Sequence, residues 1–420
     1  MIARRPSLLC AALGLALAAD LRADEAGPAL RSTSRAAVEA LGSAGARPTD
    51  PGSAAVPLTR EDAVIAARIL RDRHAARIRE GRTAEVKAGR IKLGDKEMPF
   101  AYKVFGEKPS GGHALFISMH GGGGAPARVN DQQYENQKGL YRPEEGIYLA
   151  PRAPTDTWNL WHEAHVDAFF GRLIEDLIAI EGVDPDRVYL MGYSAGGDGV
   201  YQLAPRMADR LAAAAMMAGH PNESSPIGLR NLPFAIHVGA NDAAYDRNKV
   251  ARQWGEKLDR LREDDPGGYL HRVEIHPGKG HWMDREDASA VPWMAKFRRD
   301  PAPKKVAWHQ DDVTHDRFYW LAVGPGKAKA GSTVVAEREG QEVRITAAEG
   351  VDRVTIRLDD RMLDLDRTVQ VVALGRAVFR GRVARTIATL EKTLGEAGDP
   401  GLTFAAEVDV TIPPAGPKPD

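Results

Sequence analysis

Residues 192–197 (Gly-Tyr-Ser-Ala-Gly-Gly) have the spacing of a strand-to-helix turn that exposes a serine. Gly192 and Gly196 stand two positions before and after Ser194, where a sharp turn brings neighbouring backbone so close that small residues are needed. Residues 187–191 have the apolar character of a buried strand, and the residues after the turn are compatible with a helix. The pattern predicts that this turn lifts the Ser194 hydroxyl clear of a sheet, where it can act as a nucleophile.

Residues 120–124 (His-Gly-Gly-Gly-Gly) directly follow an apolar stretch and are suited to bind an oxyanion. The charged oxygen of a tetrahedral intermediate needs backbone N–H groups close to it, and glycine lacks the side chain that would block their approach. With the serine turn, this loop resembles the HGGG loop of the α/β-hydrolase family. The resemblance implies one donor at Gly122, with Gly121 or Gly123 as near neighbours, and another at Ala195. A phosphate-binding loop is disfavoured, because neither a Lys-Ser or Lys-Thr pair nor a G-x-G-x-x-G frame is present.

An acid and a histidine should follow the serine in that chain order. Asp242 comes just after an apolar strand-like run, at the end of a strand where open α/β sheets build their sites. Asp246 is the alternative acid, near the start of the next predicted helix. His281 lies in a glycine-containing loop after the following strand, whereas His276 at the end of that strand is more typical of a packed residue.

This set of residues predicts hydrolysis by acyl transfer. His281 would accept the Ser194 proton, and Asp242 would hold the imidazole in the required tautomer. The loop amides would bind the oxyanion, and water would release the acyl group from the serine. No cofactor is expected for this reaction.

Aromatic side chains around the serine are candidate substrate contacts. Trp158 and Trp161 lie on one loop and could form a stacking wall for a sugar or an aromatic group, or could anchor the loop by packing. Both interpretations stay open, and Tyr193 is a third candidate contact.

Metal binding is not expected. His162, Glu163 and His165 resemble a zinc motif, but H-E-x-x-H requires histidine where Val166 stands. A second polar cluster at residues 309–316 is typical of a solvated linker rather than of a metal site.

The fold class expected from the apolar pattern is α/β. Between residues 114 and 299, short apolar runs alternate with amphipathic segments, which predicts a doubly wound, mostly parallel sheet with helices on both faces. The α/β-hydrolase resemblance covers roughly residues 90–300. Residues 92–105 predict a hairpin at the sheet edge, with Gly94-Asp95 as its turn.

The chain divides by composition into five segments. Residues 1–23 are typical of a secretory signal, with cleavage after Ala18, Ala19 or Ala23, and predict a secreted or periplasmic protein. A flexible lead is expected over residues 24–58 and a catalytic domain over 59–300. A smaller β-rich domain over 301–412, with one helix at 383–394, precedes a Pro-rich tail at 413–420.

Charge and cysteine content exclude several classes of function. The chain has 57 Lys and Arg against 58 Asp and Glu, so a nucleic-acid partner would lack electrostatic support. The single cysteine, Cys10, lies within the predicted signal, so its removal excludes a cysteine nucleophile, disulfides and Cys-ligated zinc. No stretch after the signal has the ~20 apolar residues of a membrane helix. The oligomeric state stays open.

Short motifs place the chain near particular branches of the superfamily. The serine turn and glycine loop look like those of bacterial esterases related to polyhydroxybutyrate depolymerases, feruloyl esterases and dienelactone-hydrolase-like proteins. Dienelactone hydrolases themselves use a cysteine where this chain has Ser194. The expected substrate is a small-molecule or polymer-borne ester. The alternatives are a prolyl-oligopeptidase-like peptidase, although no propeller precedes the core, and a noncatalytic protein that binds a polysaccharide or a partner.

Overall fold

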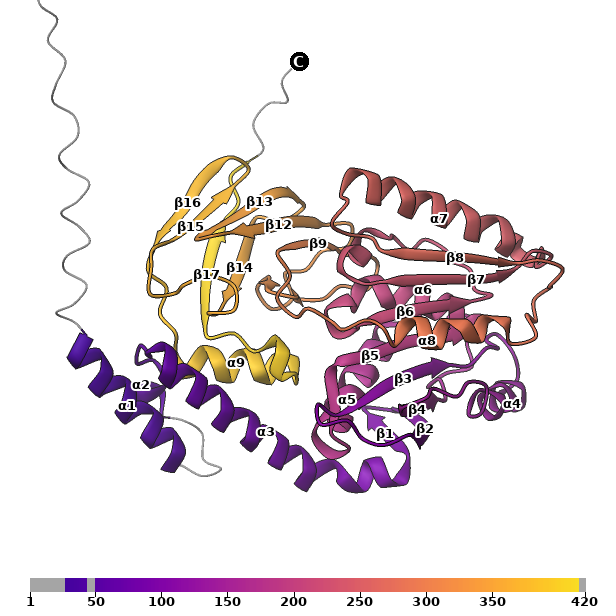
Figure 1. Ribbon diagram of the computed structural model, residues 1–420, viewed down its shortest axis with the longest axis horizontal. Helices are drawn as coiled ribbons and strands as arrows, with labels where there is room; N and C mark the ends of the chain where they lie inside the picture. Colours follow the sequence, from indigo (N-terminus) through magenta and orange to yellow (C-terminus); the bar gives the residue numbers. More distant parts are fainter. Residues whose placement is uncertain (1–26, 44–49, 415–420) are drawn as a thin grey trace, which may run out of the picture.

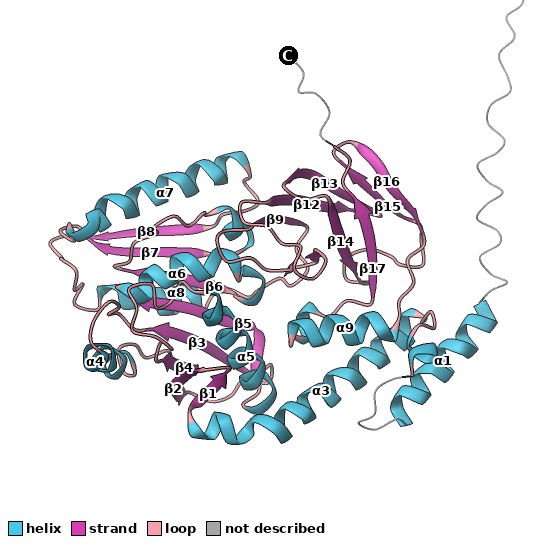
Figure 2. Ribbon diagram, turned by 180° about the vertical axis from the view of Figure 1, so that it is seen from behind, coloured by secondary structure: helices cyan, strands magenta, loops and turns pink. Residues whose placement is uncertain are grey.

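The computed structural model describes residues 27–43 and 50–414, and an eight-stranded sheet forms its centre (Figures 1 and 2). The strands of this sheet are β1 (Arg90–Leu93), β2 (Lys96–Phe105), β3 (His113–Met119), β4 (Gly146–Pro151), β5 (Val183–Tyr193), β6 (Ala213–Met217), β7 (Phe234–Gly239) and β8 (His271–His276). Their order is β1-β2-β4-β3-β5-β6-β7-β8, and neighbours from β4 to β8 are parallel. The predicted hairpin is present as β1 and β2, which pair antiparallel at the edge.

Helices cover both faces of the sheet because the strands are apolar on both sides. On β3, Leu115 and Ile117 belong to the core formed with α5 (Ala164–Ile180), α6 (Ala195–Arg206) and α7 (Arg247–Asp264). Phe116 lies between them in sequence and points to the opposite face, where α8 (Ala290–Met294) packs. Together with α4 (Ala127–Gln137) after β3, these elements confirm the predicted α/β class with a mostly parallel sheet.

The C-terminal part of the chain is β-rich, as predicted. Its strands are β9 (Lys305–His309), β10 (Arg317–Phe318), β11 (Leu321–Ala322), β12 (Thr333–Glu339), β13 (Glu342–Glu349), β14 (Arg353–Leu358), β15 (Val369–Ala373), β16 (Arg376–Gly381) and β17 (Ala406–Thr411). They form a five-stranded sheet, β16-β15-β13-β12-β9, and a four-stranded sheet, β10-β11-β14-β17. The expected helix is α9 (Ile387–Ala397), which the Thr386 side chain caps.

The β-rich part lies at the end of the molecule opposite the carboxyl ends of β3, β7 and β8 (Figures 1 and 2). In both views these strands point toward α4 and away from the two smaller sheets. The two smaller sheets therefore lie away from the loops that follow the parallel strands. One contact reaches these loops from the segment between β9 and β10: the Ser225 N–H, in the loop after β6, donates to Asp311 Oδ2 at 3.2 Å.

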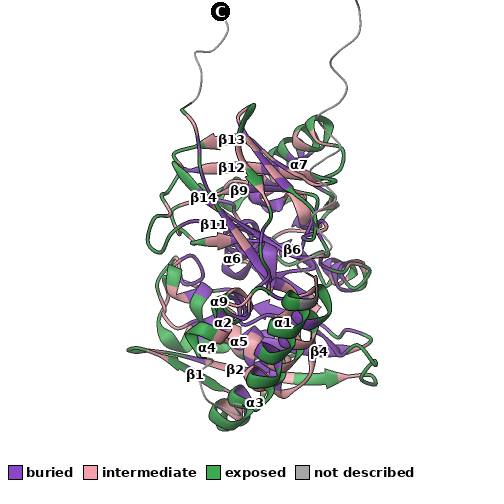
Figure 3. Ribbon diagram, turned by 90° about the vertical axis from the view of Figure 1, so that its left-hand side faces the viewer, coloured by how far each residue is buried: buried purple, intermediate pink, exposed green. Residues whose placement is uncertain are grey.

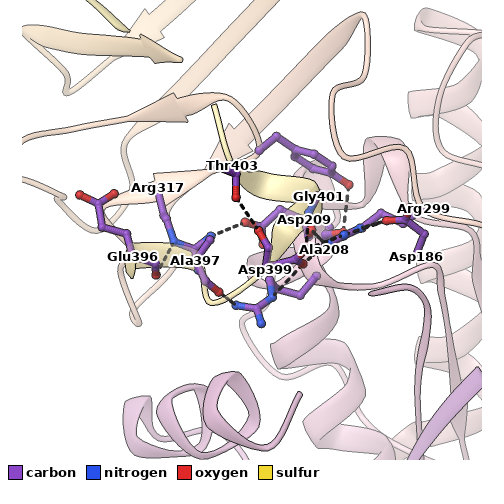
Figure 4. A network of polar contacts seen from close by, with 12 residues as sticks. Asp186, Ala208, Asp209, Arg299, Arg317, Glu396, Ala397, Asp399, Gly401 and Thr403 are labelled. Carbon is purple, nitrogen blue, oxygen red and sulfur yellow. Dashed lines mark hydrogen bonds and ion pairs between the residues drawn. The ribbon is translucent and has the colours of Figure 1, made fainter. Parts of the chain in front are cut away.

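Buried ion pairs join the β-rich part to the central sheet (Figure 4). The guanidinium of Arg299 donates to Asp399 Oδ2 at 2.6 Å and to Asp186 Oδ1 at 2.8 Å, and the side chains of Arg299 and Asp399 are almost fully buried. Arg317 pairs with Asp209 at 2.9 Å across the same boundary. Because charges removed from water are costly unless paired, this network holds the two parts in one arrangement.

The region predicted as a flexible lead differs from that expectation. Residues 27–43 form α1 (Gly27–Ser43) and residues 51–54 form α2 (Pro51–Ala54). The apolar side chains of α1 pack with those of α3 (Arg60–Ala88) and α9, and Figure 3 shows both buried and exposed stretches on α1. Packing against these other helices stabilises α1. The sequence pattern of residues 27–43 alone did not indicate this packing, because the partner residues belong to other segments of the chain. The predicted signal at residues 1–23 lies outside the described residues.

No helix in the described ranges is long and apolar enough to cross a membrane.

Replacing Arg299 with alanine should strongly destabilise the protein. The change leaves Asp186 and Asp399 without their buried counter-charge, so we expect the free energy of unfolding to fall by about 3–5 kcal/mol, measured by urea denaturation. Arg353→Ala is the matched control: Arg353 pairs with Asp409 at 3.4 Å on the surface and should cost at most about 1 kcal/mol. Equal effects of the two changes would contradict the role of the buried network.

Candidate active site

Ser194 occupies the turn between β5 and α6, in a backbone conformation that side chains rarely adopt. Its φ is 57° and its ψ is −121°. A Cβ atom on Gly192 would lie 2.2 Å from the Gly196 carbonyl oxygen, and one on Gly196 would lie 2.2 Å from the carbonyl oxygen of Met119. Only glycine fits at both positions, which is the close packing that the sequence spacing predicted.

Asp242, His281 and Ser194 form a continuous hydrogen-bonded chain. His281 Nε2 lies 2.9 Å from Ser194 Oγ, and His281 Nδ1 lies 2.8 Å from Asp242 Oδ2. Asp242 follows β7 and is 3% exposed, while His281 lies in the loop after β8. Because a carboxylate only accepts, Nδ1 carries the proton and Nε2 is free to accept from the serine hydroxyl.

The two alternative residues are placed elsewhere. Asp246 is exposed at the start of α7. His276 is buried, where Nε2 lies 3.1 Å from His237 Nδ1 and Nδ1 lies 3.2 Å from Glu286 Oε2. Burial and the neighbouring His276 lower the pKa of His237 to about 3, so His237 stays neutral. The geometry therefore brings together the three residues preferred from the sequence.

Gly121 lies directly against Ser194, and His120 forms a hydrogen bond with the Gly121 carbonyl. A Cβ on Gly121 would lie 3.1 Å from Ser194 Cβ. His120 Nε2 accepts from the Ala153 N–H at 3.0 Å, so Nδ1 carries the proton and donates to the Gly121 carbonyl at 2.6 Å. In a planar trans peptide the Gly122 N–H points to the side opposite this carbonyl, so it is turned away from His120.

Burial lowers the pKa of His120 to about 4. The neutral tautomer that holds the loop therefore persists at neutral pH. His120 was not among the site residues expected from the sequence, although its position beside the glycines could have indicated it.

Gly123 does not have a free N–H. It donates to Asn130 Oδ1 at 2.8 Å, and the Asn130 amide donates to Asp156 at 2.8 Å. The prediction of Gly123 as an oxyanion donor is therefore not supported, while Gly122 and the first helical residue Ala195 remain. Sequence reasoning missed Asn130 because its role depends on how α4 packs beside the loop.

Tyr193 supports the His281 loop rather than a substrate surface. Its hydroxyl donates to the His281 carbonyl and accepts from the Met283 N–H at 3.2 Å. The ring is 8% exposed and packs edge-on against the His281 ring. The predicted substrate contact is thus replaced by a positioning role.

The two loop tryptophans have different surroundings. Trp161 is fully buried, and its indole N–H donates to the His120 carbonyl at 3.0 Å, so it anchors the loop and cannot contact a substrate. Trp158 is 66% exposed. A Cβ on Gly124 would lie 3.4 Å from Trp158 Cβ, which places this side chain beside the glycine loop.

The polar clusters near this loop have structural partners. His315 Nε2 lies 3.0 Å from Asp167 Oδ1, and Arg206 pairs with the same carboxylate at 2.7 Å. His165 lies 3.2 Å from Glu163. Within the described part of the chain, no group of three or more His, Cys, Asp or Glu side chains is arranged to hold a metal ion.

Residues 144–311 match the dienelactone hydrolase family. The match spans less than half of the chain and includes Ser194, Asp242 and His281, but not the glycine loop. The predicted resemblance to this branch of the α/β-hydrolase superfamily is confirmed over these residues. The strand order and this match together show a core similar to that of the α/β-hydrolases.

Several solved structures resemble this chain at low identity. A thermostable esterase is 18% identical with a TM-score of 0.37, over 50% of this chain and 62% of its own. Esterase PE8 and a carboxylesterase from Mesorhizobium loti are each 19% identical with a TM-score of 0.35, over 49% of this chain and 99% of theirs. No curated protein matches the sequence. The fold assignment therefore rests on the strand order.

Asn130→Ala should slow hydrolysis while leaving substrate binding nearly unchanged. The change frees the Gly123 N–H and loosens the loop that carries Gly122, so we expect kcat to fall by about 10–100-fold with little change in KM. Gln132→Ala, an exposed change on the same helix, is the control. Steady-state kinetics with a chromogenic ester measure both constants, and a rise in KM alone would contradict the positioning role.

His120 should make stability depend on pH between about 6.5 and 4. Its pKa is lower in the folded protein than the ordinary value of 6.5, so the unfolded chain binds the extra proton first and stability falls as pH drops through this window. His120→Asn removes this contribution. Urea unfolding at several pH values should show a steeper loss in the wild type, and parallel curves would refute the assignment.

Proposed function

We propose that this protein is a serine esterase that cleaves carboxylic ester bonds through an acyl-enzyme. The observation that carries the proposal is the chain of hydrogen bonds from Asp242 through His281 to Ser194, beside a loop of glycines. These groups come from three separate loops at the carboxyl edge of the sheet, which is where open α/β sheets build their sites.

The first half-reaction acylates the serine. His281 Nε2 accepts the hydroxyl proton as Ser194 Oγ attacks the ester carbonyl carbon, and the carbonyl π electrons move to oxygen. Collapse of this intermediate breaks the bond to the alcohol oxygen, which takes the proton back from His281. The buried carboxylate of Asp242 holds the imidazole and stabilises its charged form.

The second half-reaction restores the enzyme. Water replaces the alcohol, gives its proton to His281 and attacks the acyl carbon, after which Ser194 Oγ leaves with that proton. The N–H groups of Gly122 and Ala195 serve both intermediates as oxyanion donors. Ala195 suits this role because the first N–H groups of a helix lack partners within the helix.

The location proposed for the protein rests on residues 1–23 alone. Their basic start, short apolar run and small residues support export to the periplasm or medium. A serine nucleophile needs neither a metal nor a reduced thiol, which suits such a compartment.

Loss of any member of the triad should nearly abolish ester turnover. We expect Ser194→Ala, Asp242→Asn and His281→Ala each to lower kcat on short p-nitrophenyl esters by at least ~10³-fold, because the three residues act as a unit. Asp246→Asn is the control for the acid, since Asp246 lies outside the hydrogen-bonded chain.

Two results would overturn the proposal. Wild-type turnover no faster than that of Ser194→Ala would exclude an esterase and favour a noncatalytic binding protein. Cleavage of peptide amides much faster than of esters would favour a peptidase.

A further inference from the structure

Exposed aromatic side chains concentrate around the serine. Among the residues that the structure describes, the aromatic side chains of the exposed class are Trp158, Tyr245 and Trp282, which are 66%, 77% and 49% exposed. All three lie in the segments that follow β4, β7 and β8 at the carboxyl edge of the central sheet, Tyr245 in a short 3-10 helix (Ala244–Asp246). Large apolar side chains left in water at one site mark a binding surface.

Two of these side chains are held in place by the site itself. Trp282 follows His281 directly, and its ring centroid lies 5.7 Å from that of Tyr193. Tyr245 stacks on the Arg247 guanidinium at 4.8 Å, and Arg247 lies 3.6 Å from Asp242. The surface is therefore continuous with the groups that would react.

The backbone at Tyr245 is strained. Its φ is 56° and its ψ is 24°, a left-handed conformation that is uncommon for a bulky residue. Such conformations carry a cost and cluster at functional sites. Here the strained turn coincides with a tyrosine that projects into solvent.

The aromatic side chains lie on both sides of Ser194. Trp158 follows β4 and Tyr245 follows β7, which are four places apart in the sheet, while Ser194 follows β5 midway between them. At about 4.8 Å per strand, the two loops start about 19 Å apart. A surface of this length is longer than one acyl group needs and suits a chain of several rings.

The surroundings favour sugar rings over a single aryl group. The three aromatic side chains are 49–77% exposed to water, which allows a sugar to stack its C–H face on a ring while its hydroxyl groups stay hydrated. An aryl group gains most from a closed apolar pocket. Polar residues occupy the segments that follow strands lying between β4 and β7 in the sheet. Gln133 Oε1 would be 3.7 Å from a Cβ on Gly121, and His220 and Asn222 lie on the loop after β6.

We propose that the substrate is an ester carried on an oligosaccharide or polysaccharide chain, whose rings stack on Trp158 at one side of Ser194 and on Trp282 and Tyr245 at the other. That this sugar chain carries the ester which the protein cleaves rests on the proposed esterase function. The carbohydrate-binding surface does not, because it can bind a sugar chain that bears no ester.

Binding is tested on the Ser194→Ala protein, so that turnover plays no part. The probes are unmodified xylose-, mannose- and glucose-based oligosaccharides of one to six β-1,4-linked units, titrated by calorimetry. We expect at least one series to bind more tightly as its length grows. Adding Trp158→Ala or Trp282→Ala should weaken binding of the hexamer by about 5–10-fold each, as expected for one lost stacking contact.

Leu270→Ala is the matched control, because this exposed residue lies just before β8, at the opposite edge of the sheet. It should leave the affinity unchanged. Absence of binding by all three series, affinity independent of length, or tryptophan variants equal to Leu270→Ala would each overturn the proposal. Tighter binding of methyl hydroxycinnamate than of every hexamer would overturn it in favour of an aryl subsite. Wild-type ester turnover, measured separately, reports on the esterase function.

Discussion

The close packing of backbone around the β5–α6 turn is the constraint on which the site depends. Gly196 rests against the carbonyl of Met119 at the end of β3, and a Cβ on Gly197 would lie 2.5 Å from the carbonyl of Met217 at the end of β6. The start of α6 therefore packs directly against the ends of β3 and β6. This packing points Ser194 out of the sheet and brings the loop after β3 beside it, so the proposed nucleophile and the proposed oxyanion donors share one rigid support.

Around this turn, burial determines the protonation state of two supporting histidines. His120 and His237 are buried and neutral, and each has a pKa far below the ordinary value because burial disfavours the charged form. The side chain of His281 is 42% exposed and faces the carboxylate of Asp242. A charge forming on His281 thus meets an opposite charge and solvent, while the supporting histidines keep fixed hydrogen-bonding roles.

The β-rich part contributes to this arrangement from a distance. It packs at the amino ends of the parallel strands, and its ion pairs through Arg299 and Arg317 reach the central sheet rather than the loops around Ser194. The carboxyl edge is left open on the side where Trp158, Tyr245 and Trp282 lie. An open edge suits a long ligand that must extend beyond the reacting bond.

Local spacing by itself determined the strand runs, the turn at Ser194, the glycine loop and the order of Asp242 and His281, because each depends on neighbouring residues and on sheet periodicity. The tertiary structure alone decided that Gly123 is held by Asn130, that Trp161 is buried, that Tyr193 supports a loop and that α1 is helical. These outcomes depend on contacts between distant segments: the Tyr193 hydroxyl meets a residue 88 positions away, and α1 needs α3 and α9 to bury its apolar side. Sequence patterns record which groups a turn exposes, whereas packing determines what those groups touch.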